Sequence, residues 1–405
     1  MHDVLSRAAA LAKHSDSSRN YTRTYLTPAH QAAARHIAAW MREAGMSVRV
    51  DAMGSVIGRL EGPPGAKTLL MGSHFDSVRD GGKYDGVLGI LLPIAVADEL
   101  QRCGERPPVA FEVAAFADEE GARFQTSFLA SRAMLNGAES VRPLLDRRDA
   151  DGISFADAMH AAGLDPARID EARIDASNLC AYLEVHIEQG PVLLDRGAPL
   201  GVVTSIAGGS RHLVTVRGEA GHAGTVPMPM RHDAMVAAAE MVLAVEDCAA
   251  RAKLVGTVGI VQVKNGTGNV IAGEVEFTVD LRAPDDLRRR ALERDVLGRF
   301  DAIASRRGVR VEAVKRHEVS AAPCAPWLQD QVAASITAAG AEPLRLPSGA
   351  GHDAMILAEV VDVGMMFVRC GAGGVSHNPA ETVSGEDAAL AARALLAFVR
   401  NFKPR

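Results

Sequence analysis

The stretch GSHFDSVRDGGKYDG, at residues 72–86, combines residue types that bind metal ions with glycines that allow a tight turn. His74 and Asp76 are two residues apart, so on an extended chain their side chains point to the same face. The carboxylate of Asp76 can then accept the second N–H of the His74 imidazole and orient the ring. The glycines between 81 and 86 allow the backbone to turn and return Asp85 toward His74. We therefore expect His74 and Asp85 to bind metal and Asp76 to orient His74.

Three further segments carry the same residue types directly after apolar runs. They are ADEEGARF at 117–124, EVHIEQG at 184–190 and GAGGVSHNPAE at 371–381. A single acid or histidine at the end of a strand often only caps the next helix, but four such segments together predict one shared site. The predicted metal ligands are His74, Asp85, Glu120, His186 and His377.

The predicted ligands are imidazoles and carboxylates without a thiolate, a set that suits zinc and also manganese or cobalt. Five ligands exceed what one catalytic ion with an open position needs, so we expect two ions that share a bridging carboxylate. Glu119 and Glu120 are neighbours and point opposite ways on an extended segment, so one can bind metal while the other takes a proton from water. The alternative for this pair is an acidic helix N-terminus stabilised by the helix dipole.

The elements that must position these residues alternate along the chain. Strands are predicted at 66–73, 108–117, 179–187 and 361–370, and helices at 86–104, 328–340 and 384–402. Strands alternating with helices predict an α/β fold with a mostly parallel sheet covered on both faces. Such sheets bind ligands at the carboxyl ends of their strands, where the candidate residues lie.

Residues 211–318 have a different order of predicted strands and helices. The order is strand, helix, strand, strand, helix, strand, which predicts a ferredoxin-like (βαββαβ) domain. Because α/β elements precede and follow it, this domain is predicted to be inserted into a catalytic domain made of 1–210 and 319–405. A chain of 405 residues is long enough for two hydrophobic cores.

Composition argues against several other classes of protein. A net charge of −6 gives no basic surface for nucleic acid or for an anionic membrane. No window approaches the roughly 18 consecutive apolar residues of a membrane span, and the N-terminus lacks the features of a signal peptide. The five cysteines are scattered without a C-x-x-C pair, which is typical of reduced thiols in the cytoplasm.

The motifs occur in the order found in a known family. GSHFDS, GGKYDGVLG, FADEEGARF, EVHIEQG, GHAGTVPMPMRHDA, DLRAPD and SHNPAE together resemble the hydantoinase/carbamoylase-type amidohydrolases. These are N-carbamoyl-L-amino acid hydrolases, allantoate amidohydrolases and β-ureidopropionases, within the aminoacylase/carboxypeptidase superfamily of two-metal enzymes. The resemblance implies an enzyme that hydrolyses the ureido C–N bond of N-carbamoyl-L-amino acids or allantoate and releases ammonia and CO₂.

The resemblance also implies roles for individual residues. One ion would be held by His74, Asp85 and His186, and the second by Asp85, Glu120 and His377, with zinc or manganese as the metals and cobalt or nickel as further possibilities. Glu119 would be the general base that activates water and later protonates the leaving amine. His222, in GHAGT, would stabilise the oxyanion.

Four further residues are implied to bind the substrate. These are Gln189, Asn269, Arg282 and His352. Asn269 and Arg282 would hold the substrate carboxylate, because a guanidinium can bind a carboxylate through two parallel hydrogen bonds. In the family the inserted domain is a lid that also forms a homodimer, and residues of the partner's lid complete the pocket.

Two other functions remain open at this point. An aminoacylase or dipeptidase of the same superfamily would use the same ligands, although the HIEQG motif argues against it. A non-catalytic protein that binds metal or ligand would not need Glu119 beside an intact ligand set. The particular ureido substrate is not predicted by the order of motifs, since pocket shape decides it.

Overall fold

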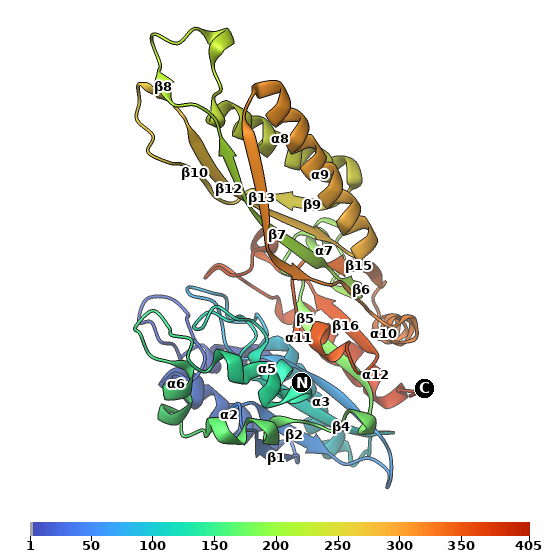
Figure 1. The fold of residues 1–405 in the computed structure, drawn as a ribbon. Helices are drawn as coiled ribbons and strands as arrows, with labels where there is room; N and C mark the ends of the chain where they lie inside the picture. The colour runs from blue at the N-terminus through green and yellow to red at the C-terminus, as the bar shows by residue number, and fades with distance from the viewer. Residues whose placement is uncertain (1–2) are drawn as a thin grey trace. The chain divides into compact units, whose positions relative to one another are not determined.

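The computed structural model describes residues 3–405. The chain forms two compact units (Figure 1), one made of Met1–Thr204 and Cys324–Arg405 and the other of Ser205–Pro323. The inserted unit extends beyond the predicted 211–318 at both ends. The difference arises because strand β6, Leu200–Ile206, is followed after one residue by β7, Gly208–Arg217, so no loop separates the units there.

The larger sheet of the chain is mixed and has the strand order β1-β2-β4-β3-β5-β16-β6-β14, and β15 also pairs with β6. The strands besides β6 are β1 Ser47–Val50, β2 Val56–Leu60, β3 Thr68–His74, β4 Ala110–Phe116, β5 Leu179–Ile187, β14 Ala322–Pro323, β15 Leu344–Ser348 and β16 Val363–Val368. The central strands β4, β3, β5 and β16 are parallel. Antiparallel strands complete both edges. The predicted α/β fold with a parallel centre is therefore confirmed.

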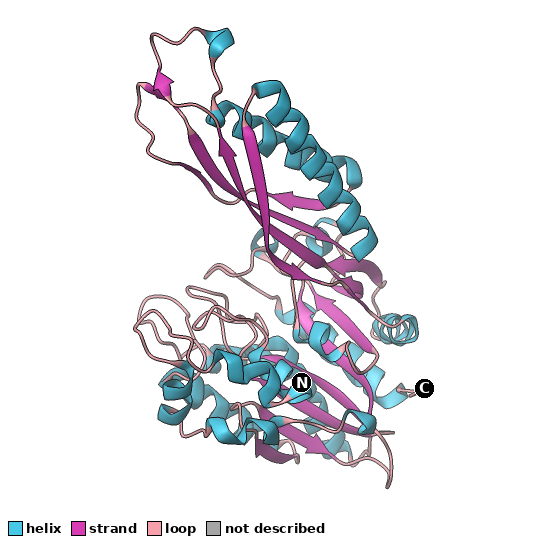
Figure 2. Cartoon of the chain, in the orientation of Figure 1, coloured by secondary structure: helices cyan, strands magenta, loops and turns pink. Residues whose placement is uncertain are grey.

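Helices surround this sheet (Figure 2). The longer ones are α2 Pro28–Glu43, α3 Leu88–Cys103, α10 Pro326–Ala338 and α12 Gly385–Asn401. The shorter ones are α1 Val4–Leu11, α4 Leu129–Asn136, α5 Ala138–Val141, α6 Phe155–Ala161, α7 Val192–Asp195 and α11 Asp353–Leu357. Local sequence sets their starts: the side chains of Thr27 and Ser384 accept backbone N–H groups at the first turns of α2 and α12. From residue 3 onward, no helix is both long and apolar enough to cross a membrane.

The inserted unit has the βαββαβ order of a ferredoxin-like fold. Its helices are α8 Ala234–Ala252 and α9 Asp286–Arg307, and its strands besides β7 are β9 Val255–Thr257, β10 Val261–Val263, β12 Glu274–Ala283 and β13 Arg310–Val319, with a small pair of β8 Gly221–His222 and β11 Val270–Ile271. The main sheet is antiparallel with the order β10-β12-β7-β13, and β9 also pairs with β12.

One face of the inserted sheet is buried against its two helices. Along β12, buried and half-buried residues alternate strictly, and Phe277 and Leu281 lie in a core with Met241 of α8 and Phe300 of α9. The region 254–264 was expected to be one strand but forms two. The ladder is interrupted at Ile260, whose N–H donates to the hydroxyl of Thr278 instead of to a backbone carbonyl.

Candidate metal centre

Buried Asp85 is the centre of a group of imidazoles and carboxylates that runs from buried His74 and His186 to exposed His377. Its Oδ1 lies 3.2 Å from Nε2 of His186 and 3.6 Å from Nε2 of His74. Its Oδ2 lies 3.2 Å from Nε2 of His377, which is itself 3.4 Å from Oε1 of Glu120. Among the described residues, four groups of side chains could each hold a metal ion, and two of these groups, His74 with Asp85 and His186, and Asp85 with Glu120 and His377, share Asp85.

The parallel strands of the large unit bring these side chains together. His74 is the last residue of β3, and His186 is the next-to-last residue of β5. Glu120 and His377 lie in the loops that follow β4 and β16. Asp85 comes from the loop between β3 and α3, where Gly86 has a φ of +66° and a Cβ would lie 2.5 Å from Nε2 of His74. The close approach of Asp85 to His74 thus requires a glycine at position 86.

The two buried histidines are oriented by acceptors behind them. Nδ1 of His74 lies 3.2 Å from the backbone oxygen of Asp76 and 3.3 Å from its Oδ1, and Nδ1 of His186 lies 2.9 Å from the carbonyl of Ile187. Because these oxygens only accept, each Nδ1 must carry the hydrogen, and Nε2 is the atom that faces Asp85. Asp76 also accepts the N–H of Glu119 at 2.9 Å, so it links two of the four segments.

The donor atoms of this centre fit divalent cations. Oδ1 of Asp85 and Oε1 of Glu120 are buried, and neither accepts a hydrogen bond from any residue that the structure describes. Unsatisfied buried carboxylate oxygens are costly, and lone pairs that face one another repel unless a cation lies between them. Imidazole nitrogens and carboxylate oxygens are the ligands that zinc and manganese accept. The residues present therefore fit two metal ions.

Burial and neighbouring charges shift the pKa values of the carboxyl groups in different directions. Burial raises the pKa of Glu119 well above its usual range, and burial with the nearby Asp85 raises the pKa of Glu120 to about 7. Burial alone would raise the pKa of Asp85, but its imidazole neighbours hold that pKa well below the usual range. The bond to Asp85 raises the pKa of His377 to about 9. Among the protein's own groups, the surroundings of Glu119 thus favour its protonated form and those of Asp85 favour the carboxylate.

The remaining predicted residues of the large unit have partners of their own. Nε2 of Gln189 donates to Oδ2 of Asp85 at 3.0 Å. His352 is 2 % exposed, its Nε2 lies 2.8 Å from Oγ of Ser348, and its ring centroid lies 4.5 Å from that of His186. Burial lowers the pKa of His352 well below its usual range. Contact of either residue with a substrate stays a prediction.

Sequence reasoning assigned no role to three residues that hold this centre. Glu184 is fully buried and accepts the Ser73 hydroxyl at 2.8 Å and the N–H of Ala354 at 3.0 Å. It lies two residues before His186 on the same strand, and this period-two spacing could have marked it. Ser376 and Glu381 bond to Asp85 or its backbone, and of the two only Glu381, an acid in the segment 371–381, stood out in the sequence by its residue type.

Three predicted residues lie in the inserted unit. His222 is on β8 opposite Val270, and the backbone oxygen of Asn269 accepts the N–H of Ala223 at 2.9 Å. Arg282 is on β12, where its Nε donates to Oδ1 of Asp280 at 3.1 Å. His222 and Asn269 are therefore neighbours. Arg282 lies on β12, eight residues from Glu274. Glu274 is at the end of β12 that is nearer to β8 and β11 (Figure 1).

A sheet with parallel central strands and two imidazole–carboxylate clusters that share an aspartate places the chain among metal-dependent α/β hydrolases. The chain belongs to the peptidase family M20/M25/M40, whose model matches residues 64–401. This match, with the relatives below, confirms the family resemblance seen in the motifs.

Relatives of known name cover nearly the whole chain. The chain is 42% identical to an N-carbamoyl-L-amino acid amidohydrolase of Geobacillus stearothermophilus, over 93% of this chain and 92% of that protein. It is 40% identical to an allantoate deiminase of Arabidopsis thaliana, over 98% of this chain and 82% of that protein. A crystal structure of a hydantoinase/carbamoylase family amidase from Burkholderia ambifaria has a TM-score of 0.89 and 34% identity, covering 98% of this chain and 96% of that one.

Proposed function

We propose that the protein is a metal-dependent amidohydrolase that cleaves the ureido C–N bond of N-carbamoyl-L-amino acids or of allantoate. The observation that carries this proposal is the pair of clusters sharing Asp85, with Glu119 beside them, in a chain whose relatives bear these two names. Hydrolysis of a terminal ureido group releases ammonia, and the carbamate that remains loses CO₂ to leave a free amine.

His74, Asp85 and His186 would hold one ion, and Asp85, Glu120 and His377 the other. We propose zinc or manganese, since no thiolate is present among these donors. When bound, such ions polarise the ureido carbonyl and make water easier to deprotonate.

Glu119 is proposed to move the proton. Its carboxylate takes a proton from the attacking water and returns it to the nitrogen that leaves, so no net proton is lost at the residue. Asp76 accepts the backbone N–H groups of Glu119 and Glu120 at 2.9 and 3.2 Å, which fixes the turn that presents Glu119. Gln189 would bind the ureido group, and His222 would donate to the oxyanion.

Asn269 and Arg282 are proposed to bind the substrate carboxylate from two different chains. Residues 274 to 282 of β12 extend over about 26 Å at the usual rise of a strand, and Asn269 lies beyond the far end. Two residues so far apart in one inserted unit cannot both contact one small carboxylate. A homodimer, in which one lid supplies Arg282 and the partner's lid supplies His222 and Asn269, removes the conflict.

Mixing two inactive variants tests this part of the proposal. Asn269→Ala and Arg282→Ala should each lose most activity on a ureido acid. After subunit exchange, heterodimers contain one pocket with both residues intact, so mixing should restore roughly a quarter of the parent activity. No restoration, with exchange verified by mass, would mean that both residues act from the same lid or not at all.

The main proposal is tested by a panel of substrates on protein loaded with Zn²⁺ or Mn²⁺. N-carbamoyl-L-amino acids, allantoate and N-carbamoyl-β-alanine are assayed for ammonia, beside N-acetyl amino acids and dipeptides. Ammonia from one ureido acid, lost in Glu119→Gln, supports the proposal. Turnover of acetyl amino acids or dipeptides alone would instead indicate an aminoacylase or dipeptidase, and no turnover of any compound would indicate a binding protein.

We also propose a cytoplasmic location. All five cysteines are free thiols in the structure, three of them buried, which suits a reducing compartment.

A further inference from the structure

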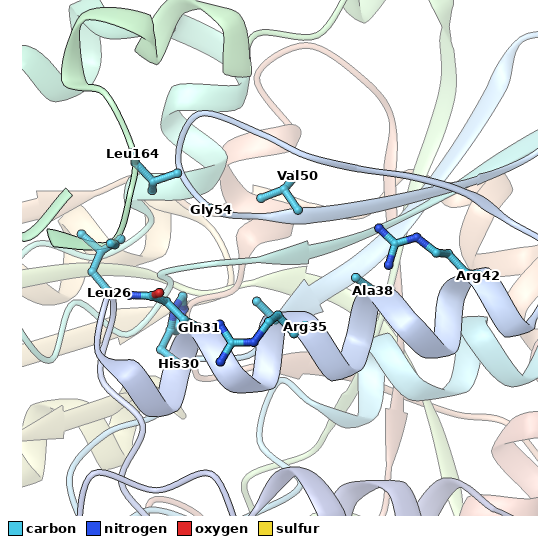
Figure 3. Close-up of a pocket in the computed structure, with 11 residues that line it drawn as sticks. Leu26, His30, Gln31, Arg35, Ala38, Arg42, Val50, Gly54 and Leu164 are labelled. Atoms are coloured by element: carbon cyan, nitrogen blue, oxygen red, sulfur yellow. The ribbon is translucent and has the colours of Figure 1, made fainter. Parts of the chain in front are cut away.

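A cavity lies in the large unit on the face of α2 (Figure 3). Its volume is about 430 Å³, within the range of small-molecule sites. Leu26, Ala34 and Ala38 form part of its apolar surface together with Val50 and Leu164 from two other segments. These side chains leave room for an apolar body several carbon atoms long.

Charge around this cavity has one sign only. Arg35 and Arg42 line it from α2 and are exposed, and neither has an ion-pair partner anywhere in residues 3–405. The described lining includes no aspartate or glutamate. Two free guanidinium groups beside an apolar surface are complementary to an anion that carries an apolar body.

His30, one of the polar side chains that line the cavity, already has a hydrogen-bond partner. His30 is buried, its Nε2 donates to the carbonyl of Ala117 at 2.7 Å, and its ring stacks on Phe75 at 4.3 Å between centroids. Burial lowers the pKa of His30 to about 4, so the ring is neutral near pH 7. His30 therefore adds no charge to the cavity, and the charged group of a ligand would lie at the arginines.

We infer that this cavity is a binding site for a small apolar carboxylate, separate from the metal centre. The carboxylate is bound by Arg35 or by Arg42, which lie two turns apart on α2 (Figure 3), and the apolar part contacts Leu26, Ala38 and Leu164. An amino acid zwitterion fits less well, since no acidic side chain is available for its ammonium group. The site also adjoins catalytic elements, because Ala117, the acceptor of the His30 bond, is two residues before Glu119.

Calorimetric titration of the metal-loaded protein with 3-phenylpropionate tests the inference, with the neutral 3-phenylpropanamide as the matched ligand. The acid should bind at least tenfold more tightly than the amide. The double variant Arg35→Gln/Arg42→Gln should bind the acid at least tenfold more weakly and the amide unchanged. Arg106→Gln, at another exposed arginine, should match the parent.

Three results would overturn the inference. The first is no measurable binding of the acid to the parent, and the second is equal binding of acid and amide. The third is an unchanged affinity of the double variant for the acid, which would place the probe elsewhere, for example at the metals. Thermal unfolding of the double variant should match the parent because both arginines are exposed, so loss of binding cannot be attributed to misfolding.

Discussion

Oε1 of Glu381 accepts the backbone N–H of Asp85 at 3.2 Å, across 296 residues of sequence. The same oxygen accepts the N–H of Tyr84 at 2.8 Å, and the Ser376 hydroxyl donates to Oε2 at 2.8 Å. A carboxylate that is 2 % exposed therefore holds the loop that presents Asp85, the residue shared by the two candidate metal clusters. Glu381 acts as a positioning residue that does not itself belong to either metal cluster.

Replacing Glu381 by alanine should lower metal affinity, because Asp85 loses the bonds that fix its backbone. We expect a fall of about 10- to 100-fold, as for other residues that orient metal ligands. Glu381→Gln keeps an acceptor oxygen and should lose less. Competition with a chelator measures the effect, and Glu386→Ala, at an exposed residue nearby, is the control. Parent-like affinity in Glu381→Ala would contradict the positioning role.

Gly86→Ala should abolish tight metal binding. A Cβ at this position would lie 2.5 Å from both the backbone oxygen and Nε2 of His74, and φ is +66°. Gly65→Ala is the matched control, since Gly65 has a φ of +77° but no atom within 4 Å of the added Cβ. If both variants lose metal to the same extent, strain in the backbone rather than crowding of His74 would be the cause.

Glu119→Gln should reduce kcat on a ureido substrate by about 10²- to 10⁴-fold without loss of metal, because proton transfer is removed while the ligands stay. Glu120→Gln should instead lower the metal content measured after dialysis. Glu139→Gln, at an exposed glutamate, should change neither property. Equal metal loss in the Glu119 and Glu120 variants would show that the two roles are not separated.

Removing the metals should lower the thermal unfolding temperature. The unsatisfied oxygens of Asp85 and Glu120 are then left in a buried site, and a ligand that binds only the folded state stabilises it by mass action. Differential scanning calorimetry before and after chelation measures the shift. Adding Zn²⁺ or Mn²⁺ back should restore the original temperature, and Glu120→Gln should show a smaller shift than the parent.

Asp51→Asn should stabilise the protein at high pH. Burial raises the pKa of Asp51 to about 6, although its Oδ1 accepts the N–H groups of Met53 and Ser55. A folded pKa above the unfolded value means that ionisation destabilises the fold; this cost is full above about pH 6 and disappears as pH falls toward 4. We expect a gain of about 2–3 kcal/mol at pH 8 and none at pH 4 from denaturant unfolding. Asp98→Asn, at an exposed site, should show no such dependence.

The convergence of the candidate ligand segments could be predicted from sequence because they follow apolar strands, and parallel strands bring their carboxyl ends together. His74 at the end of β3 and His186 near the end of β5 show this directly. Glu381 and Ser376 could not be assigned in the same way. Glu381 acts on backbone N–H groups almost 300 positions away, and such contacts leave no pattern in residue type or spacing.

The strand register separates two candidate residues of the inserted unit. Asn269 and Arg282 are close in sequence and were expected to bind one substrate carboxylate, with residues of the partner's lid completing the pocket. The pairing of β12 with β7, from Glu274 opposite Arg217 to Ala283 opposite Gly208, shows that an extended strand separates them. Their spacing along the chain could not distinguish a tight turn from a long strand.

The inserted unit begins and ends on one pair of neighbouring strands, since Ile206 pairs with Ala322 and Ser205 with Pro323. Because the two ends are already side by side, closing the large unit around more than a hundred inserted residues adds little loop entropy once the insertion has folded. The large sheet could therefore accept a longer, shorter or different module at this point without a change in its strand order. The position of the insertion makes the inserted unit an exchangeable part of an otherwise constant framework.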